Sequence, residues 1–273
     1  MLTMTILVTG ATGNVGRHVV AELVAAGEPV RAVTRSPSRV PDGVPVATGG
    51  ITDVPDMLDG VDRVFLLWPF TDAQAAPPVI SSLAAAGVSQ VVFLSARGVS
   101  DESPLFHARI EKLLRDSGVG WTFLRAGGFA TNTLEWADQV RAGVVRWVYG
   151  GAGRSLIHER DIADVAVTTL TSPGHVGAAY DLTGPETLTQ AEQVRQIGLA
   201  VGREVRWEEM PVAEARASMA ARGWDEDFLE HGLAYWASLV DEPETVTGAV
   251  EEITGKPART FAQWAVDHAA DFR

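Results

Sequence analysis

The chain has 273 residues, 46% of them hydrophobic and 21% charged, which is typical of a globular protein with one large α/β domain or two small ones. It contains no cysteine, so disulfides, thiolate catalysis and cysteine-ligated metals are excluded. The net charge of −13 comes with only two lysines and no basic run, which argues against nucleic-acid binding. The acidic residues are scattered, which favours a solvated surface over an acidic interaction tail.

Neither a signal peptide nor a membrane span is expected. An apolar strand pattern begins near residue 6, and no apolar run reaches the roughly 18 residues that a membrane helix needs. The six histidines are scattered without metal-ligand spacing, so no metal site is predicted. These patterns predict a cytoplasmic protein without a bound metal.

The first half of the chain alternates strand and helix patterns. Apolar strands are predicted at residues 5–8, 29–34, 44–47, 63–67, 90–95 and 121–125. Helices are predicted between them, at residues 15–27, 53–58, 75–86 and 105–117. Repeated strand–helix–strand units indicate an α/β fold with a doubly wound parallel sheet, the Rossmann arrangement. Ligands then bind beyond the carboxyl ends of the strands.

The second half is predicted to be mostly helical. Helices are expected at residues 134–141, 161–170, 189–201, 212–222, 224–239 and 261–272, and one strand at 179–182. No clear linker separates the parts. We expect a Rossmann domain at residues 1–184, a small, mostly helical lobe at 185–256, and a C-terminal helix at 257–273 that packs back on the body.

A glycine-rich turn joins the first strand to the first helix. Gly10 permits a tight turn, Gly13 lets the backbone approach a pyrophosphate, and Gly16 lets the helix pack close to the strand. The spacing is Gly-x-x-Gly-x-x-Gly, and the helix start offers free N–H groups to phosphate. A structural turn without a ligand is the alternative. The turn predicts a dinucleotide site formed by Thr9, Gly10, Thr12, Gly13, Asn14, Val15 and Gly16.

The end of the second strand predicts which dinucleotide binds. An NAD site usually has a carboxylate here that binds the ribose hydroxyls, whereas an arginine binds the 2′-phosphate of NADP. The segment after this strand has no carboxylate but contains Arg35 and Arg39, with Ser36 and Ser38 as further donors. Two solvated loop arginines are the alternative. In so acidic a chain, the pair favours NADP(H).

Several segments together resemble one family. They are residues 9–16, Arg35, 60–67, 121–125 with Gly128 and Phe129, 160–165, 182–186 and 254–257. The chain is similar to the NmrA-like group of atypical short-chain dehydrogenase/reductases over nearly its whole length. That group includes NADPH-dependent quinone reductases, azo- and triphenylmethane-dye reductases, and regulators that bind NADP without turning it over. The resemblance implies NADP as the usual ligand. It adds to the cofactor site Leu67, Trp68, Ser95, His107, Gly128 and Phe129.

The sequence departs from short-chain dehydrogenases at the usual proton donor. Those enzymes use a Tyr-x-x-x-Lys pair, and no tyrosine here has a lysine four residues on. The resemblance places Ser103 at the tyrosine position and His107 at the lysine position. His107 is the tentative catalytic residue, supplying a proton or holding the nicotinamide ribose. A simple contact with Glu111, one helical turn away, is equally open.

Two further features concern the adenine and the acceptor. Gly50 stands where the family often has an acidic residue near the adenine, although the backbone of Gly50 and Ile51 can still contact the base. The candidate substrate residues are aromatic side chains that suit a flat ligand, namely Trp68, Phe70, Phe129, Trp224 and Phe228. With His231 and Tyr235, the last two form an aromatic helix face that is either core packing or a roof over the substrate.

The missing tyrosine narrows the predicted reaction. Reduction of an isolated ketone builds an alkoxide that needs a nearby acid, whereas a conjugated acceptor spreads the charge and takes its proton from solvent. The sequence therefore predicts an NADP(H)-dependent oxidoreductase that transfers hydride to a quinone- or dye-like acceptor. The alternatives are a redox-sensing regulatory protein that binds NADP(H) with little turnover, and a biosynthetic enzyme with non-redox chemistry. A homodimer is also open.

Overall fold

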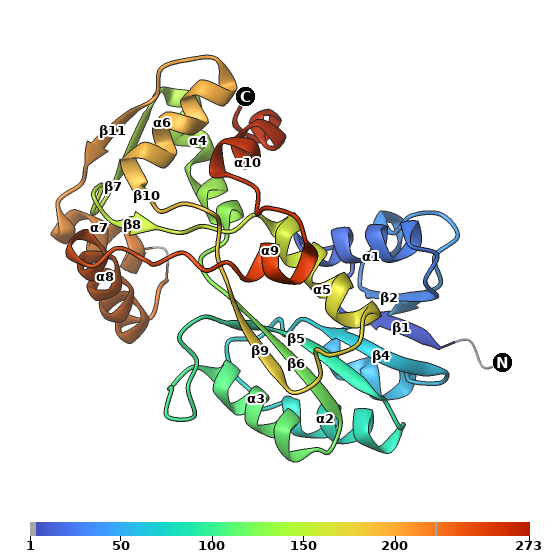
Figure 1. Ribbon diagram of the computed structural model, residues 1–273. Coiled ribbons are helices and arrows are strands. Elements are labelled where there is room, and N and C mark those ends of the chain that lie inside the picture. The colour runs from blue at the N-terminus through green and yellow to red at the C-terminus, as the bar shows by residue number, and fades with distance from the viewer. Residues whose placement is uncertain (1–3, 222) are drawn as a thin grey trace. The chain divides into compact units, whose positions relative to one another are not determined.

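A computed structural model describes residues 4–221 and 223–273, without the side chains of Asp227 and Phe228 (Figure 1). The chain forms two compact units, and neither is a continuous stretch of sequence. The first unit contains residues 1–127, 159–182 and 249–256. The second contains residues 128–158, 183–248 and 257–273. The consecutive domain boundaries expected from the sequence remain a prediction, and each unit is described by itself below.

The first unit is built on a parallel seven-stranded sheet. Its strands are β1 (Thr5–Val8), β2 (Val30–Thr34), β3 (Val46–Thr48), β4 (Val61–Leu66), β5 (Gln90–Ala96), β6 (Gly120–Ala126) and β9 (Ala178–Leu182). The order across the sheet is β3-β2-β1-β4-β5-β6-β9, with every pair parallel. This order reverses direction between β1 and β4, the place where doubly wound sheets bind ligands. The predicted fold class is confirmed.

Helices cover both faces of this sheet (Figure 1). One face carries η2 (Ile51–Met57), α2 (Ala76–Ala85) and α3 (Phe106–Asp116), which pack on alternate side chains of the strands such as Leu7, Val91 and Phe93. The other face carries α1 (Gly16–Ala25), α5 (Glu159–Thr171) and α9 (Ala249–Thr254). Because both faces are covered, the central strands are nearly continuous apolar runs, and this explains why the sequence revealed them.

The second unit is mostly helical, with two small sheets. Its helices are α4 (Ala137–Ala142), α6 (Gln190–Val201), α7 (Val212–Ala221), α8 (Glu226–Asp241) and α10 (Phe261–Asp267), with short 3₁₀ turns η3 (Ala130–Trp136) and η4 (Ala269–Phe272). Strands β7 (Val144–Trp147) and β11 (Arg206–Glu209) pair in parallel, and β8 (Gly153–Arg154) pairs antiparallel with β10 (Leu188–Thr189). The C-terminal α10 packs on α6.

Several elements differ from the sequence prediction, and most of these lie in the second unit. The helix expected at 134–141 is divided at Trp136 into η3 and α4, and Gly143 ends α4 in the left-handed conformation at φ 82°. Strands β7, β8, β10 and β11 were not predicted, because two- to four-residue strands leave no periodicity to detect. Helix α9 and the 3₁₀ turn η1 (Pro37–Arg39) were also missed. No described helix has the length and hydropathy of a membrane-spanning segment.

Candidate functional site

A cavity of about 660 Å³ opens at the carboxyl ends of β1, β2 and β4, wholly within the first unit. Many of the residues predicted for the cofactor line it. Its walls are formed by Thr9, Gly10, Thr12, Gly13, Val33, Thr34, Arg35, Ser36, Arg39, Gly49, Gly50, Ile51, Thr52, Asp53, Leu67, Pro69 and Phe70. Its position at the reversal of strand order is where a dinucleotide binds in this fold.

The glycine-rich turn has the close contacts that its sequence predicted. Gly10 has a φ of 61°, which favours glycine, and its carbonyl accepts a hydrogen bond of 2.9 Å from the N–H of Gly13. A Cβ on Gly16 would lie 2.1 Å from the Gly10 carbonyl oxygen, so only glycine lets α1 start this close to the loop. Val15 precedes α1 without a side-chain cap. The helix start therefore fits a phosphate group.

Threonine hydroxyls hold the turn in place. The Thr9 hydroxyl accepts a hydrogen bond of 2.7 Å from the N–H of Leu67 and so ties the end of β1 to the end of β4. The Thr12 and Thr34 hydroxyls lie 2.8 Å apart, and Thr34 also accepts a bond of 3.0 Å from the N–H of Ser36. This chain of bonds joins the phosphate loop to the loop that bears Arg35. Thr34 also lines the cavity, although it was not among the residues predicted for the cofactor site.

Both predicted phosphate-binding arginines reach the cavity. Arg35 and Arg39 are exposed, and within the part of the chain that the structure describes neither guanidinium has a hydrogen-bond or ion-pair partner. Ser36 also lines the cavity. Two unpaired cations beside a phosphate-binding loop fit an additional phosphate on the ribose.

The far wall of the cavity contains an acid that the sequence reasoning missed. Asp53 lines it and accepts a hydrogen bond of 2.8 Å from the N–H of Gly50. A Cβ on Gly49 would lie 2.8 Å from the same carboxylate and 2.7 Å from the side chain of Met57. Asp53 therefore fixes the turn at Gly50, whose backbone was expected to contact the adenine. The signal available in the sequence was an acidic residue three positions after Gly50.

Trp68 and Phe70 take different places. Trp68 is 7% exposed, belongs to the core, and donates its indole N–H to the Asp72 carbonyl. The prediction that it contacts cofactor and substrate is therefore not supported by its position. Phe70 is 42% exposed, packs edge-on against Trp68, and lines the cofactor cavity.

Ser95 belongs to a buried ionic cluster. Its hydroxyl donates to Glu111 at 2.7 Å, and the fully buried Glu111 also accepts hydrogen bonds from Arg115 and Arg125. These bonds raise the pKa of the Arg125 guanidinium. The cluster joins α3 to the ends of β5 and β6, so Ser95 acts here as a structural donor.

His107 is a neutral side chain near neutral pH. Burial lowers its pKa from 6.5 to about 4, although the Glu111 carboxylate acts in the opposite direction. Its ring stacks on Phe106 with 3.8 Å between ring centroids, and its buried Nδ1 has no hydrogen-bond partner among the described residues. The Glu111 carboxylate is engaged by the ionic cluster, and the catalytic role of His107 stays a prediction. His107 can still accept a hydrogen bond.

The remaining candidates lie in the second unit or outside the description. Gly128 packs under Arg154, because a Cβ there would lie 2.2 Å from its Nη2, and the following Phe129 bridges to Ile157. Trp224 lines a separate cavity in this unit. The side chain of Phe228 lies outside the described residues. His231 and Tyr235 are exposed, so they are not core packing.

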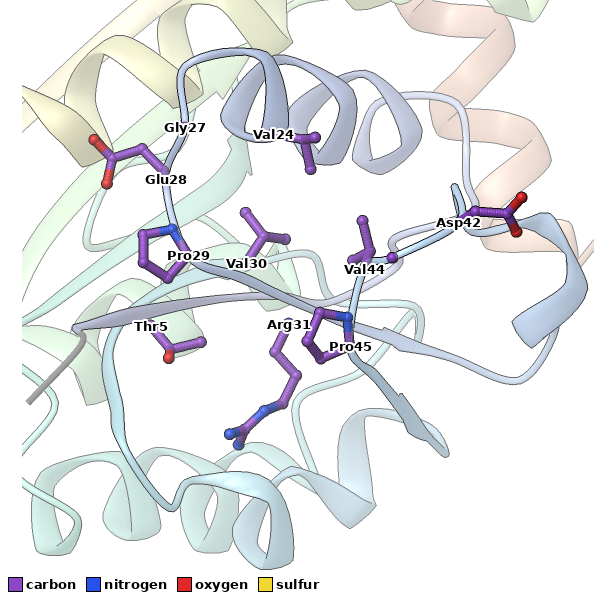
Figure 2. A pocket seen from close by; sticks show the side chains of 11 residues that line it. Thr5, Val24, Gly27, Glu28, Pro29, Val30, Arg31, Asp42, Val44 and Pro45 are labelled. Atoms are coloured by element: carbon purple, nitrogen blue, oxygen red, sulfur yellow. The ribbon is translucent and has the colours of Figure 1, made fainter.

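Another cavity of the first unit lies at the opposite end of the strands, where β1 and β2 begin. Figure 2 shows its wall, with Thr5 and Val30 at the amino ends of β1 and β2 and Val44 just before β3. Its volume is about 410 Å³. Parallel sheets bind ligands at the carboxyl ends of their strands, so this cavity is not the cofactor site.

Comparison of the sequence with known proteins identifies the family to which the chain belongs. The profile of the NAD(P)H-binding family matches residues 10–173. The chain belongs to this NAD(P)H-binding family. It is 41% identical to a (4-alkanoyl-5-oxo-2,5-dihydrofuran-3-yl)methyl phosphate reductase of Streptomyces griseus, covering 98% of this chain and 99% of the relative. It is 34% identical to an NAD(P)H azoreductase of Xenophilus azovorans, with the same two coverages.

The fold of this NAD(P)H-binding protein has close structural neighbours. The triphenylmethane reductase of a Citrobacter species, solved with NADP(H), aligns with a TM-score of 0.78 at 22% identity and covers 97% of this chain and 100% of that one. The protein is an NAD(P)H-dependent oxidoreductase, like the two relatives named above. The glycine cradle described above fits such a cofactor.

Proposed function

We propose that the protein transfers a hydride from NADPH to a small conjugated acceptor, quinone-like in its chemistry, without a side-chain acid. The observation that carries this proposal is the neutral His107, which stands where the resemblance places the lysine of the usual Tyr–Lys pair. With a pKa of about 4 its ring is neutral at neutral pH and lacks the acidic imidazolium proton of an ordinary general acid. Ser103, at the tyrosine position, has no acidic proton either.

The lack of a proton-donating side chain limits which molecules can accept the hydride. When bound, NADPH supplies the hydride. An isolated ketone would gain a localised negative charge that the residues described here cannot neutralise. A quinone, a dye or an unsaturated lactone spreads that charge over its conjugated system, so water can complete protonation. The azoreductase and the dihydrofuranone phosphate reductase named above act on conjugated systems of this kind, and they support the proposal.

The residues of the first unit would hold the cofactor through its phosphates. The turn at Gly10 and the start of α1 face the pyrophosphate, the wall at Asp53 and Gly50 faces the adenine, and Arg35 with Arg39 binds the 2′-phosphate. A charge-assisted hydrogen bond contributes about 1.5–3 kcal/mol, so each arginine gives NADPH roughly a ten- to hundredfold advantage over NADH.

The cofactor preference is tested by Arg35→Ala. We expect the ratio of NADH to NADPH dissociation constants, measured by fluorescence titration, to fall about ten- to hundredfold. Arg195→Ala, which removes an equal charge from an exposed position on α6, is the matched control and should keep the wild-type ratio. Equal affinity of the wild type for both cofactors would refute the NADP(H) assignment.

The reaction is tested by following NADPH oxidation with a panel of quinones and dyes, beside an isolated ketone. We expect turnover of conjugated acceptors and none of the ketone. Tight NADPH binding without turnover of any acceptor would instead support the second candidate, a redox-sensing regulatory protein. Ketone reduction as fast as quinone reduction would refute the role given to the missing acid.

We also infer that this reaction takes place in the cytoplasm, a location that the cysteine-free sequence favours. The proposed partner is a small aromatic or quinone-like molecule. A homodimer remains a prediction, and the molecular mass in solution tests it.

A further inference from the structure

The cofactor cavity of the first unit contains a negative charge that its proposed ligand does not obviously need. Among the described residues that line this cavity, Asp53 alone is acidic, whereas Arg35 and Arg39 are cationic. NADPH is itself a polyanion, so a carboxylate in its cavity opposes binding unless it accepts a hydrogen bond from the cofactor. Asp53 is exposed, so its carboxylate is accessible to a ligand in the cavity.

One oxygen of that carboxylate is engaged by the backbone. Asp53 Oδ2 accepts a hydrogen bond of 2.8 Å from the N–H of Gly50, which closes the start of η2. Within the part of the chain that the structure describes, no group donates a hydrogen bond to Oδ1. The bond to Gly50 therefore holds the side chain in one orientation, and Oδ1 keeps its acceptor capacity for a ligand.

The order of the strands indicates which part of a dinucleotide reaches Asp53. Strands β1, β2 and β3 are neighbours in the sheet, and the phosphate loop, Arg35 and Asp53 follow them in that order. A dinucleotide with its pyrophosphate on the phosphate loop and its 2′-phosphate at Arg35 therefore has its adenine beside the loop after β3. The 6-amino group is the hydrogen-bond donor of that base.

We propose that Asp53 Oδ1 accepts a hydrogen bond from the 6-amino group of the adenine, and that this bond makes the site select adenine over a 6-oxo purine. The inference rests on the proposed function, because it concerns the NADPH that supplies the hydride. A 6-oxo purine has an acceptor where adenine has a donor, so its carbonyl oxygen would meet the carboxylate without a hydrogen bond. Charge-assisted hydrogen bonds are stronger than neutral ones, so Asp53 is a specificity-determining residue for the base.

The test compares NADPH with its 6-oxo analogue, reduced nicotinamide hypoxanthine dinucleotide phosphate. Both dissociation constants are measured by fluorescence titration without an acceptor, so the readout does not depend on turnover. We expect the wild type to bind the analogue about ten- to hundredfold more weakly. Asp53→Asn keeps an oxygen for the Gly50 N–H and presents an amide NH₂ that can donate to the 6-oxo group. In this variant the ratio of the analogue to the NADPH dissociation constant should fall to about one or below.

Asp56→Asn is the matched control. Asp56 is exposed on the same short helix η2 and is not among the described residues that line the cavity. This variant removes an equal charge and should keep the wild-type ratio. If Asp53→Asn does not fold, Asp53→Glu takes its place. It keeps the charge but moves the carboxylate by one methylene, so its ratio should also fall below that of the wild type.

Equal affinity of the wild type for NADPH and the analogue overturns the inference, and so does an unchanged ratio in the folded Asp53 variant. Either result would show that Asp53 only closes the start of η2 or binds a ribose hydroxyl. The proposed function fails separately. If the wild type prefers NADH to NADPH, the role of Arg35 fails, and the same ratio measured with NADH and its hypoxanthine analogue still tests Asp53. Failure to bind any of the four dinucleotides would refute both.

Discussion

The partly buried His107 makes the stability of this protein depend on pH in a defined direction. Its pKa is about 4 in the folded chain, against 6.5 for an ordinary histidine. As the pH falls below about 6.5, the unfolded state binds a proton that the folded state does not, so the folded state loses stability. The loss is complete only below about pH 4.

The magnitude follows from the two pKa values. Full protonation of the unfolded state corresponds to about 3 kcal/mol, of which roughly 2 kcal/mol falls between pH 7 and pH 5. The ring is partly exposed, so solvent screening lowers the expected loss in that interval to about 1–2 kcal/mol.

The assay is urea unfolding of the wild type and His107→Phe at pH 7 and pH 5. Phenylalanine keeps the ring that stacks on Phe106 and removes the unpaired Nδ1. We expect the wild type to lose about 1–2 kcal/mol more than the variant over this interval. His231→Gln, at an exposed position on α8, should behave as wild type. An identical pH dependence of wild type and His107→Phe would refute the assignment of a neutral, partly buried His107.

Two other substitutions test the glycine-rich turn and the ionic cluster around Glu111. Gly16→Ala places a Cβ 2.1 Å from the Gly10 carbonyl oxygen, so it should lower the free energy of unfolding by about 1–3 kcal/mol and weaken NADPH binding. The control is Gly232→Ala. A Cβ there meets nothing within 4 Å, so this variant should stabilise its helix by up to about 1 kcal/mol. Equal melting temperatures of the two variants would contradict this. Glu111→Ala leaves the Arg125 guanidinium without its carboxylate and Arg115 with Asp101 alone, so it should cost about 3–5 kcal/mol by chemical denaturation. A loss under about 1 kcal/mol would show that the cluster does not hold α3.

The sequence predicted the first unit better than the second for a physical reason. The central strands of a covered parallel sheet are apolar throughout, and the turn at Gly10 needs its residues for local backbone geometry, so both leave a signal in the sequence itself. Strands β7 and β11 pair across some sixty residues and are four residues long, so nothing local marks them.

The same contrast applies to the candidate site. Arg35 was predictable because its position follows directly from the end of β2. The bond between Thr12 and Thr34, the Ser95–Glu111 contact and the low pKa of His107 depend on residues brought together by folding. The buried core position of Trp68 was missed for a related reason, because an aromatic residue after a strand can turn either toward the ligand or into the core.

The interleaving of the two units determines the order in which they can form during synthesis. All residues that line the cofactor cavity lie between Thr9 and Phe70, so all of them have been synthesised when little more than a quarter of the chain has been made. The sheet around it gains its last strand only with β9, after residues 128–158 have been made, and until then β6 has an unpaired edge. The second unit requires α10 and η4 at the very end of the chain. We therefore expect the dinucleotide-binding part to assemble on the nascent chain before the second unit, which needs α10 and η4, is complete.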